Sequence, residues 1–165
     1  MKQIFTLLCV VVALASCKQS VTKTYSIKDI VIAAEGPLFD GPNTMQANHI
    51  IDLSQIEPGL TTEHIQSVKL SKASFHTTDS VGFDNIRNFV LQLTSADAKM
   101  VKAGVLNPVP KNSKMVQLLP AAENELSDNF KQKEMFIILD ADLEGDLESN
   151  LSYTGELEFE ITYKK

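Results

Sequence analysis

The chain has 165 residues, and 21 acidic against 15 basic side chains give it a formal net charge of −6. This length fits one domain and is sufficient to bury a sizeable hydrophobic core. The acidic balance excludes nucleic acid as an expected partner, because phosphate groups are bound by Lys and Arg.

Residues 1–16 have the three parts of a secretion signal: Lys2 supplies the positive start, an apolar run follows, and small residues end it. The run is shorter than the ~20 apolar residues that cross a bilayer. The tetrad Leu14-Ala15-Ser16-Cys17 resembles the lipobox of bacterial lipoproteins. The resemblance implies that the signal is cut before Cys17 and that the Cys17 thiol carries a diacylglycerol. An ordinary signal peptide with a chance cysteine is the alternative.

Two or three acyl chains on Cys17 would hold the mature protein at a membrane essentially permanently. Cys9 would leave with the signal, so the mature chain is expected to have neither a disulfide nor a thiol nucleophile. Residues 17–24 are polar and are predicted to form a tether. Lys18 stands where an inner-membrane retention signal would resemble an Asp, which predicts the outer membrane. The tether has no acidic cluster resembling a surface-export signal, which favours the periplasmic face, with the cell surface as the alternative.

Short apolar segments separated by turn residues predict strands throughout the rest of the chain. The predicted strands are 25–34, 49–53, 65–75, 86–94, 100–106, 115–119, 135–143 and 156–163. In the last, alternation is cleanest: Phe159 is expected in the core and Glu158 in water.

Two of these strands have irregular patterns. In 25–34, one side has Tyr25, Ile27 and Val31 and the other has Ile30 and Ile32, which indicates either a strand inside a sheet or a change of face at a bulge. In 65–75 the alternation slips by one residue after Leu70, and this predicts a bulge near Ser71-Lys72.

One helix is predicted, over 121–133, because Leu126 and Phe130 are four residues apart and share a face. The fold class is therefore all-β: an antiparallel immunoglobulin-like sandwich of seven to eight strands over 25–165, with one short crossing helix.

The order of these segments also resembles a group of proteins. Ser67-Val68-Lys69-Leu70, then Phe83 to Leu93, Leu118-Leu119, a short helix and two final strands form a pattern similar to that of certain envelope lipoproteins of Bacteroidota. The resemblance implies an immunoglobulin-like sandwich in the cell envelope. It implies no activity, because no established activity accompanies that group.

An acidic segment invites a metal hypothesis. Asp140, Asp142, Glu144 and Asp146 include acids at the first and third positions of an EF-hand loop, with a glycine at the sixth. The twelfth position should be Glu and is Leu151. Calcium binding by the four acids is one interpretation, and a solvated connection between two strands is the other.

Asp79-Ser80-Val81 is similar to the three-residue O-glycosylation signal of Bacteroidota envelope proteins, which implies a glycan on Ser80. The segment is predicted to be a loop, where a glycan has room. A turn without a glycan is the alternative.

Catalysis is not expected. His49, His64 and His76 are scattered without the spacing of a zinc site, and no motif for a nucleophile or a phosphate loop occurs. No cofactor is therefore predicted. The expected function is that of a non-enzymatic envelope lipoprotein, bound to the membrane through Cys17, that contacts another envelope protein.

A module that binds a glycan or a peptide is the alternative function, with a calcium-stabilised sandwich as a further one. The chain has no Trp and three tyrosines, Tyr25, Tyr153 and Tyr163, so an aromatic platform for stacking on sugars is poorly supplied.

Overall fold

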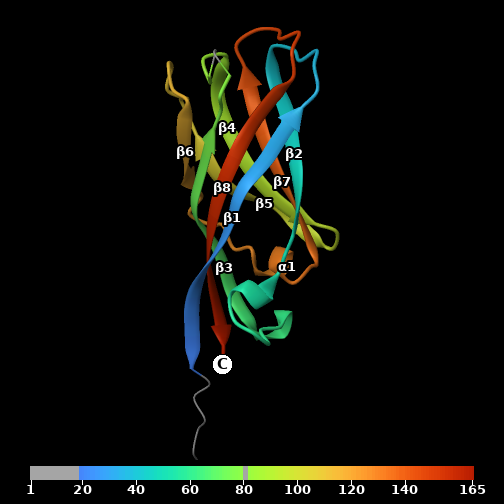
Figure 1. The fold of residues 1–165 in the computed structure, drawn as a ribbon, viewed down its shortest axis with the longest axis vertical. Helices are drawn as coiled ribbons and strands as arrows, with labels where there is room; N and C mark the ends of the chain where they lie inside the picture. Colours follow the sequence, from blue (N-terminus) through green and yellow to red (C-terminus); the bar gives the residue numbers. More distant parts are fainter. Residues whose placement is uncertain (1–18, 80–81) are drawn as a thin grey trace, which may run out of the picture.

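The computed structural model describes residues 19–79 and 82–165, and in these residues eight antiparallel strands close into a barrel (Figure 1). The strands are β1 (Ser20–Ala34), β2 (Gly41–Ile50), β3 (Ile65–His76), β4 (Ile86–Ser95), β5 (Ala98–Leu106), β6 (Met115–Pro120), β7 (Glu134–Leu143) and β8 (Leu151–Lys164). Two short 3₁₀ turns, η1 (Leu53–Gln55) and η2 (Thr62–His64), and one helical turn, α1 (Ser127–Phe130), complete the described fold. The all-β, antiparallel prediction is confirmed.

The strand order around the barrel is β1-β2-β7-β4-β5-β6-β3-β8. Two contacts in this ring are short: β1 meets β2 only at the pair Ala33 and Gln46, and β5 meets β6 only at Gly104 and Val105. The barrel is therefore flattened into two four-stranded faces, β1-β8-β3-β6 and β2-β7-β4-β5. Eight antiparallel strands divided in this way form a jelly roll.

This order differs from the immunoglobulin-like one that the sequence predicts. Immunoglobulin domains keep several sequential strands together as hairpins within one sheet. Here only the β4–β5 hairpin stays on one face, and every other connection crosses to the opposite face. Of the seven connections, three join strands that pair with each other (β1–β2, β4–β5 and β5–β6), and the other four join strands that do not.

The first strand begins at Ser20, inside the segment predicted as a tether. Ser20 to Ile27 pair with the end of β8, so the polar residues at the start of β1 have ladder partners. A register shift between Ile27 and Ile30 then changes the buried side of the strand, with Asp29 at a positive φ of 55°. Val31 is consequently exposed and Ile32 buried, which confirms the bulge interpretation.

The bulge predicted near Ser71-Lys72 is also confirmed, because the pairing of β3 with β8 shifts between Leu70 and Lys72. The predicted helix over 121–133 is reduced to α1. Residues just before α1 cover the edge of β3 instead: Asn124 Oδ1 accepts a hydrogen bond from Leu70 N at 2.8 Å, and Leu126 N donates to Val68 O at 2.8 Å.

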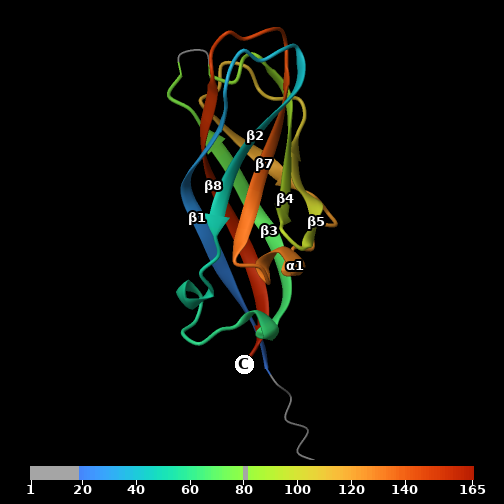
Figure 2. The same ribbon diagram turned by 90° about the vertical axis from the view of Figure 1, so that its right-hand side faces the viewer.

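The molecule is elongated, with its strands running along the long axis (Figures 1 and 2). The connections 35–40, 77–85 (of which 80–81 are not described), 107–114 and 144–150 gather at one end, here named the loop end. Ser20, the segment Leu53–His64 and Lys165 lie at the opposite end, here named the terminal end.

Each part of the core has an aromatic cluster. Phe83, Phe89 and Tyr153 pack together toward the loop end, with ring centroids 4.7–5.8 Å apart. Phe130 and Phe159 meet nearer the terminal end at 4.9 Å. These buried rings occupy the interior of the barrel.

Candidate functional site

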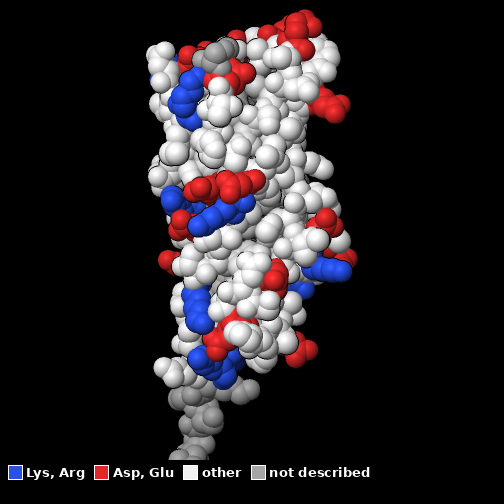
Figure 3. Space-filling model, viewed as in Figure 1, with Lys and Arg blue, Asp and Glu red and all other residues white. Residues whose placement is uncertain are grey.

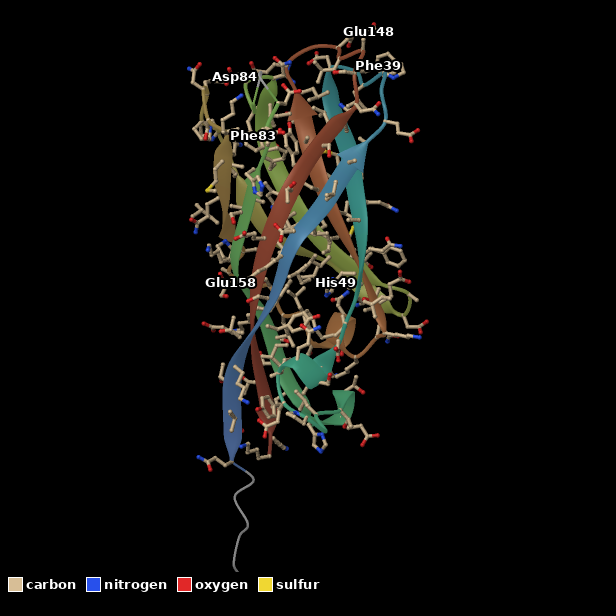
Figure 4. All side chains as sticks on the ribbon, viewed as in Figure 1. Phe39, His49, Phe83, Asp84, Glu148 and Glu158 are labelled. Atoms are coloured by element: carbon tan, nitrogen blue, oxygen red, sulfur yellow. The ribbon has the colours of Figure 1, made fainter. Side chains whose placement is uncertain are left out.

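A cavity of about 360 Å³ opens at the loop end. One side consists of residues 76–79, 82 and 85, and the other of residues 147 and 149–154. The two sides meet because the end of β3 pairs with the beginning of β8, with His76 opposite Thr154. Figure 4 labels Phe83 and Asp84 in the first connection and Glu148 in the facing loop.

Tyr153 lies on the inward side of β8 and lines this cavity. Its ring is stacked on Phe83 at 4.7 Å and meets Phe89 edge-on at 5.7 Å, so neighbouring rings fix its position. The residue is 2% exposed, and among the described residues its hydroxyl has no hydrogen-bond partner. Burial, and to a smaller extent the negative charge of Asp79, raise the pKa of this hydroxyl.

The loop beyond Tyr153 is held by backbone contacts to the β1–β2 connection. Leu38 and Leu147 exchange two backbone hydrogen bonds of 2.8 Å, and Gly36 N donates to Asn150 Oδ1 at 2.8 Å. A Cβ at Gly36 would lie 2.8 Å from Glu148 O, so glycine permits this close approach. These contacts fix the 149–154 side of the cavity.

The structure does not bring the four acids of the calcium hypothesis together. Asp140 and Asp142 point outward from β7 because the strand alternates. Asp140 accepts from Thr44 at 2.7 Å, and Asp142 pairs with Arg87 at 2.9 Å.

The other two acids also have separate protein partners. Glu144 pairs with Lys111 at 2.8 Å, and Asp146 accepts from the backbone N–H of Asp40 at 2.9 Å. Figure 3 shows acidic side chains at the loop end, yet no group of three or more His, Cys, Asp or Glu within 19–79 and 82–165 has the arrangement of a metal site. Calcium binding stays a prediction, to be tested by calorimetry with millimolar calcium.

The three histidines lie apart. His49 on β2 contacts the hydroxyl of Tyr25 at 2.7 Å, and burial lowers the pKa of its imidazole. His64 contacts the Thr61 hydroxyl at 2.9 Å, whereas His76 lines the loop-end cavity.

Cys17 and Ser80 lie outside the described residues, so lipidation of Cys17 and glycosylation of Ser80 stay predictions. Mass spectrometry of the native protein tests both. Asp79, which precedes Ser80, lines the cavity. Within the part of the chain that the structure describes, no helix combines the length and apolar character needed to cross a membrane.

Sequence reasoning missed the cavity and Tyr153. The predicted last strand begins at residue 156, but β8 begins at Leu151. The alternation of Leu151, Tyr153 and Leu157 was the available signal for the longer strand, and Gly155 weakened it. No local signal indicates that 76–85 and 147–154 face each other, since that depends on the pairing of β3 with β8.

Comparison with known proteins gives no family. No protein-family model and no curated protein matches the chain. Among solved structures, the chain is similar to the infectious bursal disease virus Gx strain (TM-score 0.40, 10% identity, 88% of this chain and 33% of that one). It is also similar to the Mud crab tombus-like virus (TM-score 0.36, 10% identity, 89% of this chain and 90% of that one). The chain thus spans about a third of the length of the first of these, and at such scores neither likeness carries an argument about function.

Proposed function

We propose that the protein is a non-enzymatic lipoprotein of a bacterial cell envelope, anchored through an acylated Cys17, whose loop end contacts a partner protein. The observation that carries the proposal is the tetrad Leu14-Ala15-Ser16-Cys17 at the end of an apolar run. The small residues give a signal peptidase access to extended backbone, and the cysteine supplies the thiol for the lipid.

The position of β1 supports an orientation. Ser20 is three residues after Cys17, a span of at most about 11 Å when fully extended. The terminal end would then rest near the lipid surface. Tyr153 and Tyr163 are ten residues apart on β8, which corresponds to roughly 33 Å along a strand. The loop end would therefore face away from the membrane.

Exposed apolar groups give a way to test the contact. Phe39 at the loop end is 64% exposed, and Ile50 at the far end of β2 is 65% exposed. A photo-crosslinking amino acid at position 39, in cells that express the full chain, is expected to capture an envelope protein. The same group at position 50 is the matched control and is expected to capture none. Equal capture from both positions, or none from position 39, would contradict partner binding at the loop end.

We infer the outer membrane as the location, with the periplasmic face favoured, because Lys18 follows the cysteine and the next residues are not acidic. Protease added to whole cells tests the face. Digestion of the domain in intact cells would place it at the cell surface instead.

A ligand-binding module is the second candidate function. The loop-end cavity favours it, as does the Tyr153 hydroxyl, which has no hydrogen-bond partner within residues 19–79 and 82–165. All three tyrosines are buried, so stacking of a sugar on an exposed tyrosine is not part of this candidate.

A further inference from the structure

The hydroxyl of Tyr153 is the starting point of the inference. Buried polar groups in native proteins almost always have a hydrogen-bond partner, and an exception requires an explanation. This hydroxyl has no partner within the described residues, although Tyr153 is only 2% exposed. A bound molecule that completes the hydrogen bond is one such explanation.

The Tyr153 side chain is held at the wall of the cavity. Phe83 and Phe89 hold the ring on its apolar sides. The charge of Asp79 acts on the hydroxyl, and Asp79 and Tyr153 line the same cavity. Tyr153 is itself one of the residues that line the cavity, so a molecule bound there lies against this side chain.

The lining specifies the chemistry of that molecule. Apart from His76, Asp79 and three apolar or glycine positions, it consists of hydroxyl and amide side chains. The hydroxyl and amide members beside Tyr153 are Thr77, Thr78, Ser149, Ser152, Thr154, Asn85 and Asn150. Hydroxyls and amides both donate and accept hydrogen bonds, which suits a ligand whose own groups do the same.

The charge of the lining and the volume of the cavity restrict the class of ligand further. Among the described residues, the lining has no Lys or Arg and includes the acidic Asp79, while the Lys114 ammonium lies beside it and donates to the backbone oxygen of Asp79. The charges at the cavity therefore offset each other, and neither an anion nor a cation is favoured. The volume of about 360 Å³ is near the lower limit of the ~300–1,000 Å³ that is usual for small-molecule sites. A ligand of one or two rings is the size that fits.

We propose that the loop-end cavity binds a small uncharged polyhydroxylated molecule, a monosaccharide unit or a similar polyol, and that the Tyr153 hydroxyl is one of its hydrogen-bond partners. This inference rests on the ligand-binding candidate and is independent of lipidation at Cys17. Recognition is by hydrogen bonds within the cavity, without stacking on an exposed aromatic ring.

Binding is tested with the full-length protein in a detergent that has no sugar headgroup. Glucose, galactose, mannose and N-acetylglucosamine are titrated, and binding is followed by saturation-transfer NMR. At least one sugar is expected to bind the wild type. Tyr153→Phe keeps the stacked ring and removes only the hydroxyl, so it is expected to weaken that binding about 3- to 10-fold, the value of one hydrogen bond.

Two further variants test whether the sugar binds in the loop-end cavity. Thr78→Val removes an exposed hydroxyl of the lining and is also expected to weaken binding, without a change in the core. Tyr163→Phe removes a hydroxyl at the terminal end and is expected to leave binding unchanged. Without ligand, Tyr153→Phe is expected to unfold at the same or a higher temperature than the wild type, because it removes an unpaired buried group.

The inference is overturned if none of the four sugars binds up to the millimolar range, or if Tyr153→Phe binds as tightly as the wild type. Preferential binding of inorganic phosphate or of trialanine would overturn it as well. None of these outcomes depends on acylation, so failure here is distinguishable from failure of the lipoprotein proposal.

Discussion

Glu57 joins three parts of the chain at the terminal end. Its carboxylate accepts hydrogen bonds from the Tyr163 hydroxyl at 2.6 Å and from Lys23 at 2.8 Å, and Lys165 lies 3.3 Å away. These interactions, the one with Lys23 foremost, lower the pKa of Glu57 to about 2. One side chain thus connects the η1–η2 segment to the first and last strands.

A pH dependence follows from this pKa. The Glu57 carboxyl takes up a proton near its ordinary pKa of 4.5 in the unfolded chain, but only near 2 in the folded one. Its contribution to stability is therefore complete above about pH 4.5 and is lost as the pH falls through about 2. In urea unfolding, the wild type is expected to lose its advantage over Glu57→Gln across this window. Glu160→Gln, at an exposed position of β8, is the control and should show no such convergence.

Phe159 shows how much one core ring contributes. Its side chain is 0% exposed and meets Phe130 at 4.9 Å, which confirms its predicted inward position. Phe159→Ala is expected to lower the free energy of unfolding by ~3–5 kcal/mol in urea denaturation.

The neighbouring Glu158 provides the comparison for Phe159. It pairs with Lys72 at 3.3 Å on the surface, where an ion pair contributes at most about 1 kcal/mol. Glu158→Ala is therefore expected to be nearly silent in the same measurement. Equal losses in the two variants would mean that the register of β8 is wrong.

At the level of the elements, β8 is central because it pairs with both β1 and β3 along most of its length. Gly155 is the position in β8 where a side chain would not fit. A Cβ there would lie 2.7 Å from Cε1 of the buried Phe75 and 3.2 Å from Cγ2 of Ile30. Glycine at this position thus allows the Phe75 ring to lie against the strand.

Gly155→Ala is expected to destabilise the protein by ~1–3 kcal/mol, the usual cost of overpacking a core. Thermal unfolding measures it. Glu156→Ala, at the adjacent outward position, is the control. An unchanged or raised melting temperature for Gly155→Ala would contradict the packing of Phe75 against β8.

The buried side of an individual strand could be predicted from the sequence, because the alternation of apolar and polar residues directly determines which side chains are buried. The bulge after Leu70 is an example, since a slip in alternation reports a change of the buried side. β2 was missed over most of its length because Gly41, Pro42 and Asn43 are turn residues. The structure accommodates Pro42 because β2 pairs along its length only with β7 and meets β1 at a single pair, and proline is tolerated in such edge-like strands.

Structural features that depend on contacts between residues distant in sequence could not be predicted from the sequence. The helix over 121–133 is shortened to α1 because Asn124 and Leu126 pair with the edge of β3, which no local pattern reports. The jelly-roll order and the cavity have the same origin, as both depend on which strands pair. That the Tyr153 hydroxyl has no partner in the described part of the chain is likewise a property of the assembled core.

On the scale of the whole molecule, the two proposed contact regions lie at opposite ends of the elongated barrel. The terminal end brings together the start of β1 and the end of β8, with Ser20 opposite Lys164. The loop end has the cavity and the exposed Phe39. With a lipid on Cys17, the proposed membrane contact and the proposed partner and ligand contacts are at opposite ends of the strands.

We propose that Cys17 is the acylated residue and that its lipid fixes this orientation. Metabolic labelling with a radioactive fatty acid tests it directly, using the full chain, Cys17→Ser and, as matched control, Cys9→Ser in the signal. We predict label in the wild type and in Cys9→Ser and none in Cys17→Ser, with the labelled forms in the detergent phase on partitioning. Label that persists in Cys17→Ser, or a wild type without label, would contradict the account.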